Sequence, residues 1–290
     1  MREYSVRFKI SISLIIAGAV LFLFGLLILT SKPPKSYFEL EKYEYTAQSS
    51  DIKSVDINIG YGEVRIVSGT SFKMKCENVD KDRFEYKISS NVLTINYDVD
   101  RIESMYMGKG KGIDTVFEIT LPNKLLEEVS FSQIKGSADI KGISCNRLDI
   151  VSEMSDITLN GVTVNHDTSL DMGSGSCKFT SCTLERPDIK GGSGDIVFMS
   201  SRISNMTYDG QLGDLDVTGC ILAGSSKLIT GSSDVRLHLL SGENSYGFSF
   251  DKGRGDITVA GKSYKEYDTK AGENNIYIDN GFGNVTISFG

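Results

Sequence analysis

The sequence has few of the residues on which common catalytic and metal sites depend. Its 290 residues include no Trp, four Pro and two His. Two His leave little material for His-based catalysis or for a multi-His metal site. The formal net charge of −7 argues against a nucleic-acid partner, because phosphate backbones are bound by basic surfaces. Thirty Gly with so few Pro fit neither a collagen repeat nor a Pro-rich linker.

One segment near the start is long and apolar. Residues 10–29 carry no charge, and a helix of that length spans about 30 Å, the hydrocarbon thickness of a bilayer. A removable signal peptide is the alternative, but its apolar core is usually about 7–15 residues and ends at a small-residue cleavage site. Residues 29–34 offer no such site. We therefore expect a single transmembrane anchor over residues 10–30.

The expected topology places the bulk of the chain outside the cell. Basic residues lie on both sides of the anchor, and Glu39, Glu41 and Glu44 follow it, which favours an inward N-terminus. We expect a cytoplasmic tail over 1–9, a linker over 31–50, and extracytoplasmic placement of residues 31–290 at the cell membrane.

A Gly-rich turn followed by alternating apolar residues recurs through the second half of the chain. Examples are Gly192-Ser-Gly-Asp-Ile-Val-Phe198 and Gly253-Arg-Gly-Asp-Ile-Thr-Val259. The residues that follow the turns are separated by 20, 19, 19, 20, 22 and 28 positions, and they are Asp156, Ser176, Asp195, Asp214, Asp234, Asp256 and Asn284. A period near 20 suits one coil of a parallel β-solenoid, with glycines where the backbone bends sharply.

The register of this repeat supports a shared core. Positions one and three after each turn residue are apolar, while the position between them is mostly polar, which is strand alternation with one buried face. Further apolar columns lie six and eight residues after the turn and before it. We therefore predict an all-β fold, a parallel β-helix or β-solenoid with coils of about 20 residues over 116–290. An antiparallel sandwich is the alternative, although it would not keep one turn chemistry at a steady step.

The region over 51–115 follows a different pattern. Residues 84–97 read as two alternating strands around Ser90-Asn91, which predicts a hairpin. Residues 104–112 contain three Gly and read as a mobile loop. We predict that 51–115 forms irregular capping strands and a loop in front of the first full coil.

The chain resembles the bacterial putative-adhesin family, a domain of unknown function. The residues that carry the resemblance are 54–66 with the Gly60-Tyr-Gly-Glu63 turn, 116–122, and the later Gly-x-Gly-Asp turns. The resemblance covers about residues 50–290. It implies a β-solenoid carried by one membrane helix in Gram-positive envelope proteins, and it implies no catalytic residues.

The aspartates of the turns are the candidate metal ligands. In stacked coils Asp195, Asp214 and Asp234 would lie about 5 Å apart, with Asp256 continuing the line, and Ca²⁺ would relieve their repulsion. The alternative is that each Asp caps its turn, which Ser176 and Asn284 at equivalent positions favour. We expect capping, and therefore no resident metal or cofactor.

The remaining motifs have structural explanations. Cys182 and Cys220 share a column two coils apart, and Cys145 fits the same column, so we predict buried free thiols rather than disulfides. His166 and His238 fall at different offsets, which gives Ser–His or Cys–His catalysis no support. The Arg254-Gly-Asp256 tripeptide occupies an ordinary turn of the repeat.

The sequence thus favours a membrane-anchored, extracytoplasmic, adhesin-like binding or structural module of the cell envelope, not an enzyme. Its partner would be an envelope protein or polysaccharide, contacted by outward residues such as Lys178, Arg202, Arg236 and Lys262. One alternative is an accessory protein that senses or regulates envelope stress. Another is a carbohydrate-active β-helix that uses carboxylates such as Asp214 or Asp234.

Overall fold

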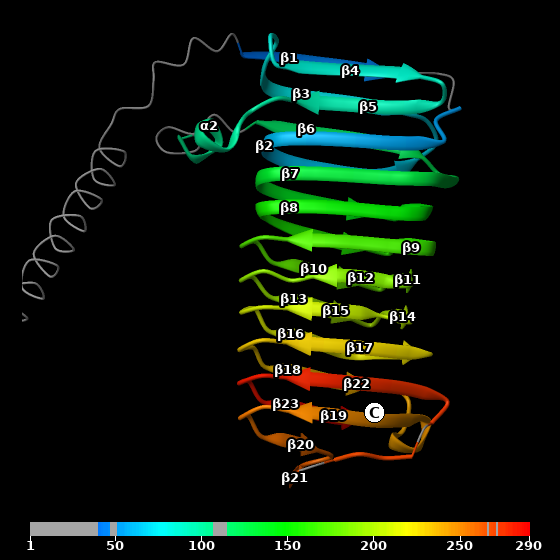
Figure 1. The fold of residues 1–290 in the computed structure, drawn as a ribbon. Coiled ribbons are helices and arrows are strands. Elements are labelled where there is room, and N and C mark those ends of the chain that lie inside the picture. The colour runs from blue at the N-terminus through cyan, green and yellow to red at the C-terminus, as the bar shows by residue number, and fades with distance from the viewer. Residues whose placement is uncertain (1–39, 47–50, 107–114, 266, 271) are drawn as a thin grey trace, which may run out of the picture. The chain divides into compact units, whose positions relative to one another are not determined.

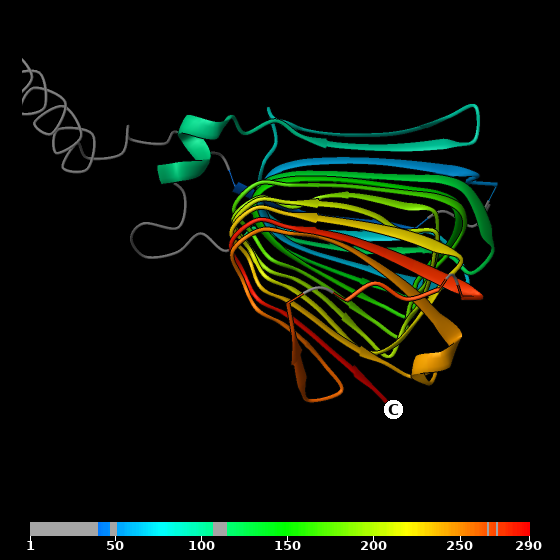
Figure 2. The same cartoon turned by 60° about the horizontal axis from the view of Figure 1, so that its bottom comes forward.

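Coils of β-strand stack into a three-walled solenoid in the computed structural model of this chain (Figures 1 and 2). The structure describes residues 40–46, 51–106, 115–265, 267–270 and 272–290. The predicted tail over 1–9 and anchor over 10–30 lie outside these residues. Within the described residues no helix is long and apolar enough to cross a bilayer.

The wall that leads into the glycine turns is called here the β17 wall. Its strands pair in parallel, except for the antiparallel β4–β5 hairpin at one end. In spatial order it contains β4 (Phe84–Ser89), β5 (Val92–Tyr97), the first half of β2 (Ser54–Gly69), parts of β7 (Leu125–Lys141), β8 (Ser144–Asn160) and β9 (Thr163–Met172), then β12 (Pro187–Lys190), β15 (Thr207–Gly210), β17 (Ser225–Thr230), β22 (Asn274–Asn280) and β19 (Tyr246–Lys252).

The wall that leaves the glycine turns is called the β18 wall. In spatial order it contains β1 (Leu40–Thr46), β3 (Lys73–Asp80), β6 (Val116–Pro122), the ends of β2, β7 and β8, then β10 (Cys177–Thr180), β13 (Ile196–Met199), the start of β16 (Leu215–Ala223), β18 (Val235–Leu239), β23 (Val285–Phe289), β20 (Ile257–Val259) and β21 (Lys262–Tyr264). The short β14 wall closes each coil with β11 (Thr183–Glu185), β14 (Arg202–Ser204) and the end of β16.

The predicted core columns are confirmed. In the first column Ile157, Cys177, Ile196, Leu215 and Val235 are paired in register and buried. In the next apolar column the rings of Phe179 and Phe198 stack with centroids 4.6 Å apart. No single coil could bury these side chains, so each coil depends on its neighbours for a core.

The turns require glycine, but for a different reason from the one predicted. Gly175, Gly194 and Gly213 have ordinary φ values, so they are not needed for a bend that other residues could not make. A Cβ on Gly194 would lie 2.2 Å from the carbonyl oxygen of Gly175, and one on Gly213 would lie 1.9 Å from that of Gly194. Glycine is required because adjacent coils approach backbone to backbone at this corner.

The other two corners do use left-handed backbone. Gly142, Gly161, Ser181, Ser200 and Gly219 have φ between 50° and 65° and follow one another from coil to coil, which turns the chain from the β18 wall into the β14 wall. A second left-handed column, made of Arg186, Asn205 and Gly224, turns the chain toward the β17 wall. The sequence showed no shared residue type at these positions.

Coil order departs from chain order at both ends of the stack. At the C-terminal end β22 and β23 insert between β17–β18 and β19–β20, so Val285 pairs with both Val235 and Ile257. The expectation that Asp256 directly follows Asp234 was therefore wrong, and the irregular 22- and 28-residue steps are the trace of this insertion. At the N-terminal end β2 inserts between the β5–β6 coil and β7.

The prediction for residues 51–115 was right for the hairpin and wrong for β2 and for the start of the loop, while residues 107–112 of the predicted loop lie outside the described residues. β4 and β5 pair around Ser90 and Asn91, both with positive φ, as a two-residue turn requires. However, β2 forms 13 register pairs with β7 and is a full coil, because it carries its own Gly60–Gly62 turn. Residues 104–106, where the predicted loop begins, belong to helix α2 (Arg101–Tyr106). Part of the predicted linker, residues 40–46, is strand β1, antiparallel to β3.

Candidate binding surface

The turn aspartates form a ladder of hydrogen bonds along the glycine corner. The backbone N–H of Asp214 donates to Asp195 Oδ1 at 2.9 Å, and that of Asp234 donates to Asp214 Oδ1 at 2.9 Å. Asn284 takes the next place, since its N–H donates to Asp234 Oδ1 and its Oδ1 accepts from the N–H of Asp256. Each side chain therefore satisfies a backbone donor of the next coil.

This ladder gives a structural role to the side chains of three of the four Ca²⁺ candidates, Asp195, Asp214 and Asp234. Repulsion between neighbouring carboxylates is relieved by Arg236, which donates to Asp214 Oδ2 at 2.9 Å and to Asp234 Oδ2 at 3.0 Å. The hydrogen bond to Asp214 in turn raises the pKa of Arg236. Among the described residues no group of three or more His, Cys, Asp or Glu is placed to hold a metal ion. The arrangement supports the capping interpretation of Asp195, Asp214 and Asp234, whereas Asp256 joins the ladder through its backbone N–H.

All five cysteines are free and buried, as predicted. Burial raises the pKa of Cys76 and Cys145 to about 12 and that of Cys220 to about 11, so these thiols stay protonated and unreactive near neutral pH. Cys182 and Cys220 share a column, with Ser201 between them. Cys145 does not belong to it, because Cys145 pairs with Val164, one column away.

The other predicted site residues lie apart. His238 Nδ1 is 3.0 Å from Ser288 Oγ on the adjacent strand, while His166 is exposed on β9. The guanidinium of Arg254 lies 5.6 Å from the ring centroid of Phe282 at the glycine corner. The outward cations are exposed, but they lie on separate strands: Lys178, Arg236 and Lys262 on β10, β18 and β21 of the β18 wall, and Arg202 on the β14 wall.

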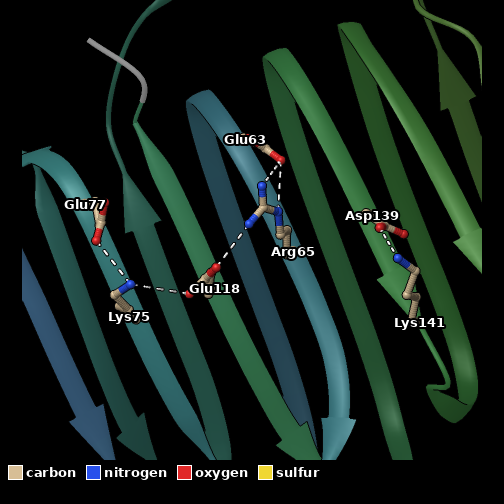
Figure 3. A network of polar contacts seen from close by, with 7 residues as sticks. All are labelled: Glu63, Arg65, Lys75, Glu77, Glu118, Asp139 and Lys141. Carbon is tan, nitrogen blue, oxygen red and sulfur yellow. Dashed lines mark hydrogen bonds and ion pairs between the residues drawn. The ribbon is translucent and has the colours of Figure 1, made fainter.

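A network of ion pairs covers the N-terminal part of the β18 wall (Figure 3). Arg65 pairs with Glu63 at 2.7 Å and with Glu118 at 3.1 Å, and Lys75 links Glu118 to Glu77. These side chains come from β2, β6 and β3, so the network ties together strands distant in sequence. Because opposite charges neutralise one another throughout, this surface offers no strong charge to a ligand.

A hollow with a volume of about 620 Å³ lies on the β17 wall near its C-terminal end. Its outward-facing side chains come from adjacent strands in direct register: Thr207 beside Lys227, Lys227 beside Tyr277, and Tyr277 beside Ser249. Ser225 and Asn275 precede Lys227 and Tyr277 by two residues on the same strands, and Thr269 borders the hollow from the segment 267–270. This set is called here the β17 groove.

The chemistry of the β17 groove is hydroxyl, amide and aromatic. Among the described residues that line it, Lys227 is the one charged side chain and none is a carboxylate. The next outward column along the same strands carries Asp209, Asp279 and Asp251, which flank the groove. A volume of several hundred cubic ångströms is typical of small-ligand sites. The groove can therefore hold a flexible polar ligand that presents both hydroxyls and an apolar face.

Sequence reasoning did not find this groove. Tyr277 lies beside Lys227 only because β22 inserts next to β17, 50 residues away in the chain. The alternation of β22 does place Tyr277 on the outward face, and an exposed aromatic residue there was the available signal.

Residues 52–288 match the family model for Toastrack DUF4097. The fold is similar to a putative adhesin from Bacteroides fragilis, with 15% identity, 88% of this chain and 98% of that chain covered, and a TM-score of 0.49. It is also similar to a putative lipid binding protein from Parabacteroides distasonis, with 13% identity, 85% and 96% covered, and a TM-score of 0.46. A putative cell adhesion protein from Clostridium sporogenes gives 10% identity, 87% and 100% covered, and a TM-score of 0.33. No curated protein matches the sequence.

Proposed function

This chain belongs to the Toastrack DUF4097 family, and we propose that it is a membrane-anchored, extracytoplasmic binding module of the bacterial cell envelope whose β17 groove holds a neutral polysaccharide. The membrane attachment in this proposal is supported by the uncharged apolar segment over residues 10–29, which is long enough to span a bilayer as a helix. The solenoid supports it by presenting flat, rigid walls, which suit contact with an extended polymer.

The groove is the observation that carries the choice of ligand. Sugar rings combine an apolar C–H face with many hydroxyl groups, and the groove offers the Tyr277 ring beside Thr207, Ser225, Ser249 and Asn275. We propose binding rather than hydrolysis, since the described residues of the lining supply hydroxyl, amide and aromatic groups and not the carboxylate pair that glycoside hydrolysis requires. The module binds without cutting.

Binding is tested with the full chain in detergent micelles, titrated with neutral polysaccharides extracted from bacterial envelopes. We expect Tyr277→Ala to weaken binding about tenfold, because the ring supplies the stacking surface. Phe282→Ala is the matched control, since Phe282 is 63% exposed at the glycine corner outside the groove. Equal binding by both variants, or no binding to any polysaccharide, would contradict the proposed ligand.

Two further measurements separate the other parts of the proposal. Mass spectrometry of bound polysaccharide should find no shortened chains after long incubation, whereas release of oligosaccharides would show an enzyme. Protease treatment of intact cells should degrade the solenoid, and full protection of residues 51–290 would contradict the extracytoplasmic placement.

A further inference from the structure

The N-terminal end of the solenoid has an open strand edge. Among the described residues β4 pairs only with β5. The two-residue turn makes Ser89 and Val92 a hydrogen-bonded pair, and at the other end the N–H of Asp98 donates to the carbonyl of Arg83. Hydrogen-bonded pairs alternate in antiparallel ladders, so Glu85, Lys87 and Ser89 direct their backbone groups toward β5. The intervening residues direct theirs toward the open edge.

Of the features that usually prevent edge-to-edge pairing, this edge has exposed charges, Glu85 and Lys87, but neither a proline nor a bulge. Tyr86 is 37% exposed and Ile88 is 40% exposed, although both lie on the side that faces the core in β5. The Tyr86 ring contacts Tyr45 of β1 at 5.0 Å between centroids, and a hollow of about 370 Å³ adjoins the strand. The end of the core is thus partly uncovered.

We propose that β4 pairs antiparallel with β4 of a second copy of this chain, joining two solenoids end to end about a two-fold axis at Tyr86. In this register Tyr86 faces Tyr86 of the second copy as a hydrogen-bonded pair, and Phe84 faces Ile88. Both interactions use the backbone groups that point to the open edge. The sheet of the β17 wall then continues from one copy into the other.

Charge selects this register over its neighbours. With the axis at Tyr86, Glu85 of each copy faces Lys87 of the other in a pair without backbone hydrogen bonds, where side chains are closest. Moving the axis by one residue places Glu85 opposite Glu85, or Lys87 opposite Lys87. Both side chains are exposed, so they are available for these pairs. The pattern Glu-Tyr-Lys is self-complementary only in the proposed arrangement.

Charge exchange tests the interface with the full chain in detergent micelles, using light scattering to measure mass across a dilution series. Glu85→Lys alone and Lys87→Glu alone should each weaken dimerisation roughly tenfold, because two attractive pairs become repulsive. The double variant E85K/K87E should restore the dimer, and a mixture of the two single variants should form mixed dimers. Lys190→Glu, an exposed change on β12 in the middle of the stack, is the control.

The proposal is overturned if the unaltered chain stays monomeric at the highest concentration. It is also overturned if every variant dimerises equally, since another surface would then be responsible. Failure of polysaccharide binding leaves this result unaffected, because the groove and β4 lie at opposite ends of the β17 wall.

Cross-linking tests the same register in membranes. Opposed residues of a hydrogen-bonded pair have Cα atoms about 5.5 Å apart, a distance that a disulfide spans. Tyr86→Cys should therefore give a disulfide-linked dimer on mild oxidation, and the five natural cysteines are buried and will not compete. Ser89→Cys is the control, since residue 89 does not face its own copy in this register. Equal cross-linking by both variants would contradict the assigned axis.

Discussion

The two ends of the solenoid differ in how the edges of their outermost strands are covered. Each end has a coil inserted out of chain order, β2 at one end and β22 with β23 at the other, and each is covered by antiparallel strands. At the C-terminal end both outermost strands offer little free edge. β21 is only three residues long, and Asp268 and Thr269 lie along β19 and accept hydrogen bonds from it. At the N-terminal end β4 is six residues long and exposes apolar side chains along an open edge.

The difference shows how side chains can end a stack of coils by occupying the backbone groups of its last strand. On β19 the N–H of Phe248 donates to Thr269 Oγ1 at 2.8 Å, and that of Phe250 donates to Asp268 Oδ1 at 2.9 Å. These side chains satisfy edge amides without adding a strand, so nothing further can pair there. The β4 edge has only Glu85 and Lys87 to deter pairing, and these charges complement a second copy. One end terminates the stack, and the other is suited to extend it.

Engineered disulfides give the largest expected effect, because the outcome is all or none. Arg236 and Thr286 are outward residues paired in register on β18 and β23. The variant R236C/T286C should form a disulfide on oxidation, whereas R236C/T258C should not, because Thr258 is two strands away at about 10 Å. Non-reducing peptide mapping distinguishes the two disulfides. The reverse pattern would mean that β20, and not β23, lies next to β18, so that the coils stack in chain order and nothing is inserted at this end.

Glycine substitution should be the most destabilising single change at either end. A Cβ on Gly60 would meet the Val99 carbonyl oxygen at 2.0 Å, and one on Gly283 would meet that of Ser233 at 1.8 Å. Alanine at either position should cost about 3 kcal/mol in urea denaturation, since backbone must move. Gly242→Ala is the control, because nothing lies within 4 Å of its Cβ position. Similar midpoints for all three variants would refute the close approach of coils.

Removing the cover of β19 should have an intermediate effect. The variant D268A/T269V deletes two acceptors for edge amides and should lower the free energy of unfolding by about 1–2 kcal/mol. Hydrogen exchange should then be faster at Phe248 and Phe250 but unchanged in β4, whose edge never had this cover. Unchanged exchange at both phenylalanines would mean that the segment does not protect this end.

The ion-pair network of Figure 3 should matter least. Arg65 pairs with Glu63 and Glu118 at the surface, where each side chain is nearly half exposed. Arg65→Leu should lower the melting temperature by only about a degree in dilute buffer, and the difference should vanish in high salt. A loss that persists at high salt would indicate packing of the Arg65 stem rather than charge.

Much of the coil could be predicted from local patterns. The 19- and 20-residue steps, the buried columns and the buried thiols all follow from strand alternation within one coil. Cys145 was misplaced by one column because the two coils that follow it advance 19 residues to Val164 and 20 more to Leu184, so its column continues at Leu184 and not at Cys182. Left-handed corners escaped detection because Gly, Ser, Asn and Arg all occupy them.

The candidate binding surface could not be predicted, because its parts meet only across coils. Thr207, Lys227, Tyr277 and Ser249 each occupy an ordinary outward position, and no spacing in the sequence links them. The capping of β19 is similar, since Asp268 and Thr269 lie about 20 residues from the amides that they bind.

The sequence by itself determined the length of a coil and the face of each strand that is buried, since both follow from local alternation and from the spacing of the turns. It also located the glycine corner, but the reason that only glycine fits there is the close approach of adjacent coils, which belongs to the tertiary structure. The tertiary structure decided which coils are neighbours at the two ends. Every coil carries the same columns and the same turn, so any two coils can stack with similar burial. The connections, the corner conformations and the covering segments break this equivalence and place β2 and β22 out of order.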